Sequence, residues 1–268
     1  KMLQEEMHFE YVRFHGLFHD ELGIVIRDDE GKIRYRWQEI DKVFDSLKAI
    51  NIRPLVELGA MPVELASEDI TIFRWNMNVS KPKEYNEWYD LVFAFVSHMV
   101  DRYGLKEVEK WRFEVWNEPN QKVNKDNPST YTNLLVRTCE AIKRVDPEAK
   151  IAAFALASVD ARYLSHVLND LRQMGKTDLF SHVSLHKYYE NPDDCDYDFM
   201  TLRKIIHDFN SEIIVFQGES GCPSKLEWTH ALKHIQFDEY IQAKTVLRRM
   251  CCDFAIGQAC SVFTLTDL

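Results

Sequence analysis

The chain has 268 residues, of which 46% are hydrophobic and 12% aromatic, and its formal net charge is −10. This length fits one large α/β domain with its own core. The negative charge disfavours nucleic acid or an anionic membrane as the main partner. No apolar run reaches the roughly 18 residues that a membrane helix needs. The six cysteines show no CxxC spacing and no small disulfide framework.

Strand-type and helix-type segments alternate about every 35 residues, which is typical of repeated βα units around a parallel sheet. The predicted strands cover residues 9–14, 53–58, 111–116, 150–157, 182–186, 213–221 and 259–264. The predicted helices cover residues 36–50, 83–103, 129–145, 161–174, 198–209 and 238–252. The connections 17–32, 59–82 and 220–237 are predicted loops, and we expect the second to overhang a pocket because it is too long for a simple turn.

This order predicts an α/β protein with the (β/α)8 TIM barrel fold. Seven strands are predicted, and every strand except the last is followed by a helix. A complete barrel needs one more strand before residue 1 and one more helix after residue 268. We therefore expect residues 1–268 to form a single barrel that is a fragment of a longer protein. The compartment and the oligomeric state stay undefined.

The segment from Trp111 to Asn120, WRFEVWNEPN, indicates a carboxylic acid placed at the end of a strand. Its first six residues alternate in the period-2 pattern of a strand. Pro119 then ends the strand, because proline cannot donate to a strand ladder and restricts the residue before it. Asn117 and Glu118 therefore lie at the carboxyl end of a strand, where a (β/α)8 barrel assembles its active site.

A second carboxylate is also predicted at the carboxyl end of a strand. The apolar strand at residues 213–221, IIVFQGESG, ends in Glu219 with glycines on both sides. Two carboxyl groups, one to protonate the leaving oxygen and one to attack the anomeric carbon, are what a retaining glycosidase requires. They stand about 5–5.5 Å apart in retaining enzymes and about 6.5–9.5 Å apart in inverting ones. Glu118 and Glu219 therefore predict a glycoside hydrolase.

The sequence resembles glycoside hydrolase clan A, and within it family 39, the β-xylosidase and α-L-iduronidase family. The matching stretches are residues 11–18 (YVRFHGLF), 53–62 (RPLVELGAMP), 113–120 (FEVWNEPN), 37–47 and 101–104. The resemblance is close over residues 9–155 and loose elsewhere. It implies that residues 1–268 form a catalytic barrel. The implied activity is that of a β-xylosidase-like retaining O-glycosidase acting on a glycoside or oligosaccharide by double displacement, without a metal or other cofactor.

The resemblance also implies roles for individual residues. Glu118 would be the general acid/base and Glu219 the nucleophile, and Asn117 would donate a hydrogen bond to the sugar 2-hydroxyl. His15 and His186 would bind substrate hydroxyls or orient the nucleophile. The remaining substrate-binding candidates are Tyr188 as a partner of the nucleophile, Trp116 beside the acid/base, and Phe263. Phe263 stands where family 39 xylosidases carry a tryptophan that forms the sugar-binding floor.

Several alternatives stay open at this level. The Gln-Gly-Glu-Ser-Gly sequence around Glu219 departs from the Thr-Glu pattern of the family, so a non-catalytic carbohydrate-binding barrel is an alternative function. The two histidines could also be satisfied core residues. Glu57 and Glu114, on strands, are expected to be ion-pair partners within an inner polar network.

A metal-assisted hydrolase is the third possibility, and the pattern of histidines argues against it. No His/Asp ligand cluster is apparent in the sequence. His182 and His186 lie about 13 Å apart along a strand, which is too far to share one ion.

Overall fold

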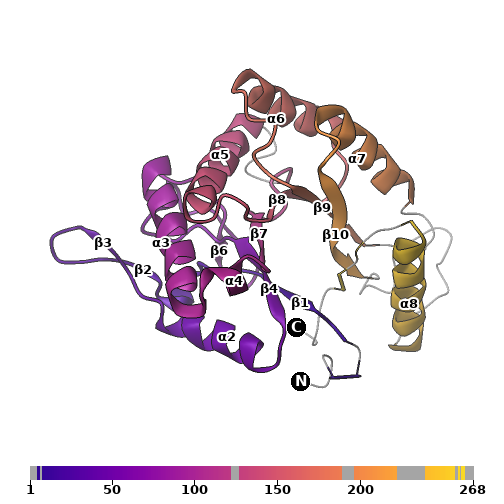
Figure 1. Ribbon diagram of the computed structural model, residues 1–268. Coiled ribbons are helices and arrows are strands. Elements are labelled where there is room, and N and C mark those ends of the chain that lie inside the picture. The colour runs from indigo at the N-terminus through magenta and orange to yellow at the C-terminus, as the bar shows by residue number, and fades with distance from the viewer. Residues whose placement is uncertain are drawn as a thin grey trace.

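The computed structural model describes residues 5–6, 8–121, 127–188, 196–221, 239–256, 259 and 261–262. Six parallel strands form one curled sheet, with helices along its outer side (Figure 1). Their order across the sheet follows their order in the chain, which is the arrangement of a (β/α)8 barrel. The strands are β1 (Tyr11–Phe14), β4 (Arg53–Leu58), β7 (Arg112–Val115), β8 (Ile151–Leu156), β9 (His182–Tyr188) and β10 (Ile214–Gly221).

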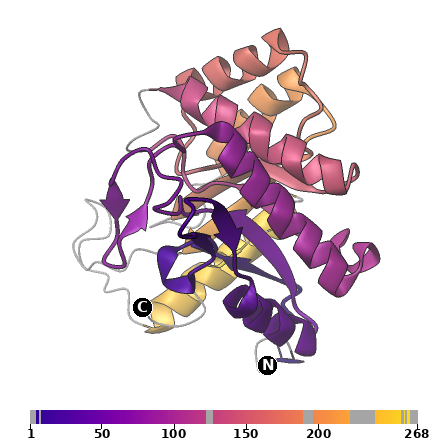
Figure 2. The same cartoon turned by 90° about the vertical axis from the view of Figure 1, so that its left-hand side faces the viewer.

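The helices form an arc around the sheet, and the long pair α3 and α5 run side by side in both views (Figures 1 and 2). Local sequence explains where they begin. The Asp160 carboxylate accepts hydrogen bonds from the first backbone N–H groups of α6, and Pro128 occupies the first turn of α5. The helices are α2 (Gln38–Ala49), α3 (Tyr85–Tyr103), α4 (Leu105–Val108), α5 (Pro128–Val145), α6 (Ala161–Gln173), α7 (Asp196–Phe209) and α8 (Glu239–Ala255).

The core lies between the sheet and this arc of helices. β8 is buried along its whole length, as expected for a strand covered on both faces. Of the predicted last strand, residues 259–264, the structure describes residues 259, 261 and 262, and these three are not part of a strand. Its described part runs beside β10, because the Gln217 N–H donates to the Ala259 carbonyl (3.0 Å) and the Ser220 hydroxyl to the Ser261 carbonyl (2.6 Å).

The connection 17–32 is not the plain loop that the sequence predicts. It contains a 3-10 turn, Asp20–Leu22, and most of an antiparallel hairpin of β2 (Val25–Arg27) and β3 (Ile33–Tyr35). The Asp28 carboxylate closes the hairpin turn by accepting from the N–H groups of Glu30 and Lys32. Strands of three residues are too short to give a periodic signal, which is why the pattern misses them.

The connection 59–82 contains a second short hairpin, formed by β5 (Thr71–Ile72) and β6 (Met77–Asn78). The Trp75 ring of this hairpin packs against Gly16, which follows the end of β1. Gly16 has a φ of 80° and no side chain, which leaves room for the ring. This long connection therefore lies over a strand end, as expected.

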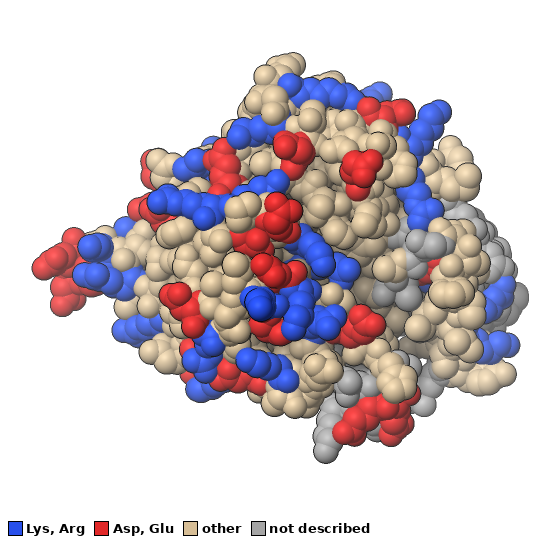
Figure 3. Space-filling view, viewed as in Figure 1, with Lys and Arg blue, Asp and Glu red and all other residues tan. Residues whose placement is uncertain are grey.

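Acidic and basic side chains are interspersed on the face shown in Figure 3, which fits a solvated surface. A hollow on the molecule, at the amino ends of the strands, is lined by Tyr11, Arg53, Lys106, Glu109, Lys110 and Lys150. None of the helices in the described part of the chain has the length and apolarity to span a bilayer.

Candidate active site

Glu118 is positioned by a loop that turns sharply after β7 and is tied to the end of β8. Trp116 and Glu118 have positive φ values of 70° and 45°, a region that bulky side chains rarely adopt. The Glu118 N–H donates to the Ala155 carbonyl (3.0 Å). The Asn120 amide holds the same strand end, because it accepts from the Ala157 N–H and donates to the Ser158 carbonyl, both at 3.0 Å. These bonds hold the Glu118 backbone at the carboxyl edge of the sheet.

Glu219 reaches the same edge through a bulge in β10. The register with β9 shifts between Gln217 and Glu219, which leaves Gly218 as the extra residue. A Cβ atom at Gly218 would lie 3.1 Å from the His186 ring and from the Ser184 Cβ atom. The glycine therefore makes space for the His186 ring against the backbone of β10.

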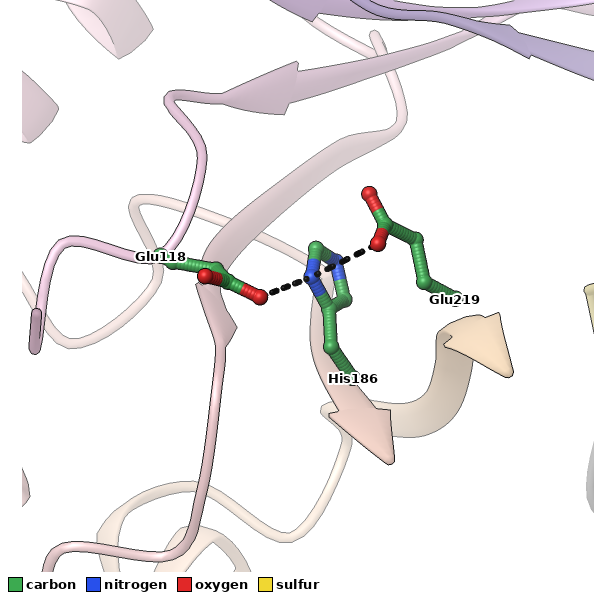
Figure 4. A group of neighbouring side chains, drawn as sticks. All are labelled: Glu118, His186 and Glu219. Atoms are coloured by element: carbon green, nitrogen blue, oxygen red, sulfur yellow. Dashed lines mark hydrogen bonds and ion pairs between the residues drawn. The ribbon is translucent and has the colours of Figure 1, made fainter. Parts of the chain in front are cut away.

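His186 lies between the two glutamates (Figure 4). Its Nδ1 atom is 3.2 Å from Glu118 Oε1 and 3.6 Å from Glu219 Oε2. One oxygen of each carboxylate and one nitrogen of His186 all lie within 4.8 Å of one another. Within the described part of the chain, the buried Nε2 atom of His186 has no hydrogen-bond partner. The Nδ1 edge of the ring therefore faces both carboxylates.

Arg13 on β1 is the cation around which the site is built. Its guanidinium contacts the carboxylates of Glu57 (2.9 Å), Glu114 (2.5 Å) and Glu219, and it donates to the Asn117 side-chain oxygen (3.0 Å). Burial by itself lowers the pKa of Arg13, but the three carboxylates raise that pKa well above its ordinary value. Arg13 is therefore a permanent positive charge that links β1 to β4, β7 and β10.

Glu219 is held in its ionised form. Burial raises its pKa, but His186, Arg13 and the Tyr188 hydroxyl outweigh burial, so the net pKa lies below the ordinary glutamate value. The Tyr188 hydroxyl donates to Glu219 Oε2 at 2.7 Å, and the Tyr188 pKa is raised by its own burial and by this carboxylate. The result is a carboxylate with two fixed hydrogen-bond donors at a strand end.

His15 and Glu57 form a second charged pair beside Arg13. The His15 Nδ1 atom is 2.5 Å from Glu57 Oε2. Burial lowers the pKa of His15, but Glu57 outweighs burial and raises it above the ordinary value. Burial likewise raises the pKa of Glu57, and His15 and Arg13 together bring it below the ordinary value. Both directions favour a charged pair at neutral pH.

This pair predicts a pH-dependent stability. A raised pKa in the folded state means that the His15 contribution is complete below the unfolded pKa of about 6.5 and is lost as pH rises through the folded pKa. We therefore expect His15→Gln to lower the free energy of unfolding most at pH 5–6 and less at pH 9. Urea unfolding of both proteins across this range measures the difference. A gap that is constant with pH would contradict the pairing.

The structure brings most of the predicted site residues to one edge of the sheet. Glu118, Glu219, His186, Tyr188, Asn117 and His15 form one connected network through Arg13 and Glu57. Trp116 differs, because it is only 2% exposed and packs edge-on against Trp88 of α3. Its left-handed backbone turns it into the core rather than onto the pocket surface. Phe263 lies outside the described residues.

Sequence reasoning gave no role to Arg13 or Ser184. Ser184 on β9 donates to Glu114 (2.5 Å) and so completes the inner network. Glu57 and Glu114 are confirmed as ion-pair partners of Arg13. A signal for Arg13 does exist, because alternation puts it on the same side of β1 as His15, opposite Val12 and Phe14.

No ligand cluster is apparent in the sequence, but three possible metal ligands lie together in the structure. Glu118, His186 and Glu219 come from three separate strand ends, so no spacing along the chain reveals their grouping. Their donor atoms lie close enough to surround one ion, although Arg13 already supplies a positive charge to Glu219.

Comparison with known proteins identifies the family of this chain. The sequence matches glycosyl hydrolases family 39 over residues 1–208, a range that includes Glu118 and His186. The chain belongs to glycosyl hydrolase family 39. The match ends before Glu219, so the place of that residue in this family 39 chain comes from the sheet geometry described above.

The relatives of this family 39 chain include characterised glycosidases. It is 40% identical over 228 residues to a beta-xylosidase of Geobacillus stearothermophilus, covering 77% of this chain and 45% of that protein. It is 31% identical over 147 residues to the alpha-L-iduronidase of Mus musculus, covering 53% of this chain and 21% of that protein. The chain thus spans less than half the length of these relatives.

Solved structures confirm the fold class. The chain superposes on a monomeric beta-xylosidase of Caulobacter crescentus CB15 with a TM-score of 0.85, at 31% identity, covering 98% of this chain and 55% of that one. For a family 39 enzyme of Xanthomonas axonopodis pv. citri the TM-score is 0.86, at 30% identity, with coverage of 99% and 54%. The predicted barrel fold is therefore confirmed.

Proposed function

We propose that this chain is the barrel of a retaining β-xylosidase in which Glu118 is the general acid/base and Glu219 the nucleophile. One observation carries the proposal. Oxygens of the two carboxylates lie within 4.8 Å of each other at the carboxyl ends of β7 and β10. This bound on the nearest oxygens agrees with the spacing of about 5–5.5 Å in retaining enzymes and lies below the roughly 6.5–9.5 Å of inverting ones.

The two carboxylates divide the reaction into two displacements. In the first, a Glu219 oxygen attacks the anomeric carbon while the Glu118 proton moves to the leaving oxygen, so the glycosidic bond breaks and a glycosyl ester forms. In the second, Glu118 takes a proton from water, whose oxygen attacks the same carbon and releases Glu219. Two inversions at one carbon retain its configuration.

The neighbouring residues support these roles. Arg13 and Tyr188 hold the Glu219 carboxylate ionised and fixed in direction, which a nucleophile requires. Arg13 also donates to the Asn117 side-chain oxygen, so the NH₂ group of that amide is oriented away from Arg13. This NH₂ group can then donate to the sugar 2-hydroxyl. His186 contacts both carboxylates and orients them relative to each other.

The substrate follows from the relatives rather than from the pocket. The family 39 relatives with 40% and 39% identity are both named beta-xylosidases, from Geobacillus stearothermophilus and Caldicellulosiruptor saccharolyticus. A non-catalytic barrel is the weaker alternative. The unusual sequence around Glu219 produces a bulge that seats His186, and it leaves the carboxylate paired with Arg13 and Tyr188.

The configuration of the first product tests the mechanism. We expect the purified protein to hydrolyse 4-nitrophenyl β-D-xyloside and to release β-xylose first, followed by slow mutarotation to the α anomer. Proton NMR of the anomeric signals during the first minutes measures this. Release of α-xylose first would establish inversion, and the absence of hydrolysis across aryl glycosides would favour the non-catalytic barrel.

A further inference from the structure

An aromatic pair stands on the β5–β6 hairpin, close to the site but outside the network of charged residues. The rings of Phe73 and Trp75 stack with centroids 5.4 Å apart and an interplanar angle of 11°. Phe73 is 53% exposed. Single exposed apolar residues are ordinary, but two parallel rings next to a catalytic site are a surface with a definite shape.

The pair is held in place by its surroundings. The Trp75 ring packs over Gly16, where an added Cβ atom would come within 3.1 Å of it. The Trp75 carbonyl is 2.7 Å from the His19 Nε2 atom. Phe73 has a φ of 61°, a strained value for a bulky residue, and its carbonyl accepts from the Asn76 N–H at 3.4 Å. The Phe73 ring is thus fixed in position by a tight turn.

His15 connects this pair to the catalytic centre. The His15 ring meets Phe73 and Trp75 edge-on, with centroids 5.9 Å and 5.4 Å away. The same His15 binds Glu57, which binds Arg13, which binds Glu219. Glu219 is only 8% exposed. Phe73 therefore lies on the solvent-exposed side of this series of contacts, and the Glu219 carboxylate lies on its buried side.

We infer that Phe73, backed by Trp75, is a stacking platform for the leaving-group sugar of the substrate. The sugar that is attacked must reach the buried Glu219 carboxylate, so the part of the substrate that extends toward solvent is the leaving group. A pyranose ring presents a face of C–H bonds, which complements the electron-rich face of an aromatic ring. The inference deepens the proposed function and rests on it, because it assigns the ligand of a subsite on the solvent-exposed side of the same site.

The test compares two substrates that differ only in the leaving group. Phe73→Ala is expected to raise KM for xylobiose about 3- to 10-fold with little change in kcat, because stacking stabilises the ground state and the transition state alike. KM for β-xylosyl fluoride, whose leaving group has no ring, is expected to stay unchanged. Phe73→Trp keeps an aromatic face and is expected to retain the xylobiose KM. Val63→Ala is the matched control, since Val63 is also 53% exposed in the same connection.

Each other outcome has a distinct meaning. An unchanged xylobiose KM in Phe73→Ala would overturn the platform, and an equal rise for both substrates would overturn its assignment to the leaving group. If the wild type hydrolyses neither substrate, the proposed function fails. Titration of tryptophan fluorescence with xylobiose then still decides the platform, because weaker binding by Phe73→Ala than by Val63→Ala supports it and equal binding overturns it.

Discussion

Replacing Glu219 by glutamine is expected to lower kcat/KM on aryl β-xylosides by about 10⁴-fold or more. The amide has no charge with which to attack the anomeric carbon, and loss of a covalent nucleophile typically costs on this scale. Glu219→Gln also loses the ion pair with Arg13, so circular dichroism and a thermal melt must show that the variant is folded. Initial rates with 4-nitrophenyl β-D-xyloside measure the effect.

Glu212→Gln is the matched control for this variant. Glu212 is an exposed carboxylate two residues before β10 begins, so the same substitution there changes charge without touching the pocket. We expect its kcat/KM to equal that of the wild type. If Glu219→Gln kept more than about 1% of the wild-type rate, Glu219 would not be the nucleophile, and the roles assigned to Arg13 and Tyr188 would lose their basis.

Replacing Arg13 by methionine is expected to have the largest effect on stability. It would leave Glu57, Glu114 and Glu219 without their shared cation, and breaking a buried ion pair from one side costs about 3–5 kcal/mol. The surface pair of Arg34 with Asp28 provides the control, because solvent screens it and Arg34→Met should lower the free energy of unfolding far less than Arg13→Met does. Urea unfolding at pH 7 compares the two variants with the wild type.

The same variant has a pH signature that a purely structural role would not produce. Arg13 helps to lower the pKa of Glu219, so its removal raises that pKa and moves the acid limb of kcat/KM to higher pH. A depressed carboxyl pKa gives stability that is complete above the unfolded value of about 4.3 and is lost as pH falls through the folded pKa. The stability gap between wild type and Arg13→Met should therefore narrow at low pH. An unmoved acid limb would show that Arg13 does not tune the nucleophile.

The sequence predicted most of the scaffold because strands and helices of this fold carry strong periodic signals. The observed bounds of β4 equal the predicted ones, and those of β7 and β10 differ by one residue at an end or at both. Glu118 and Glu219 were predictable as partners, because the carboxyl ends of parallel strands meet at one edge. The short hairpins were not predictable, since two or three residues cannot establish a period.

The network inside the site was only partly predictable, for physical reasons. An arginine in an alternating strand looks like an ordinary polar position, and only the curled sheet shows that Arg13 meets three glutamates. Alternation alone would place Trp116 on the same side as Glu114, but its left-handed backbone turns it against Trp88. The space that Gly218 leaves for His186 likewise depends on the register of β10 against β9, which becomes visible only once the two strands are paired.

Trapping the glycosyl-enzyme intermediate tests most directly whether Glu219 is the nucleophile. The protein would be treated with 2,4-dinitrophenyl 2-deoxy-2-fluoro-β-D-xyloside, whose fluorine slows both displacements while the good leaving group lets the first one proceed. Intact mass and peptide mapping would then locate the sugar. We expect one fluoroxylosyl group per chain, esterified to Glu219. An adduct on another carboxylate, or steady turnover of ordinary xylosides with no adduct, would contradict it.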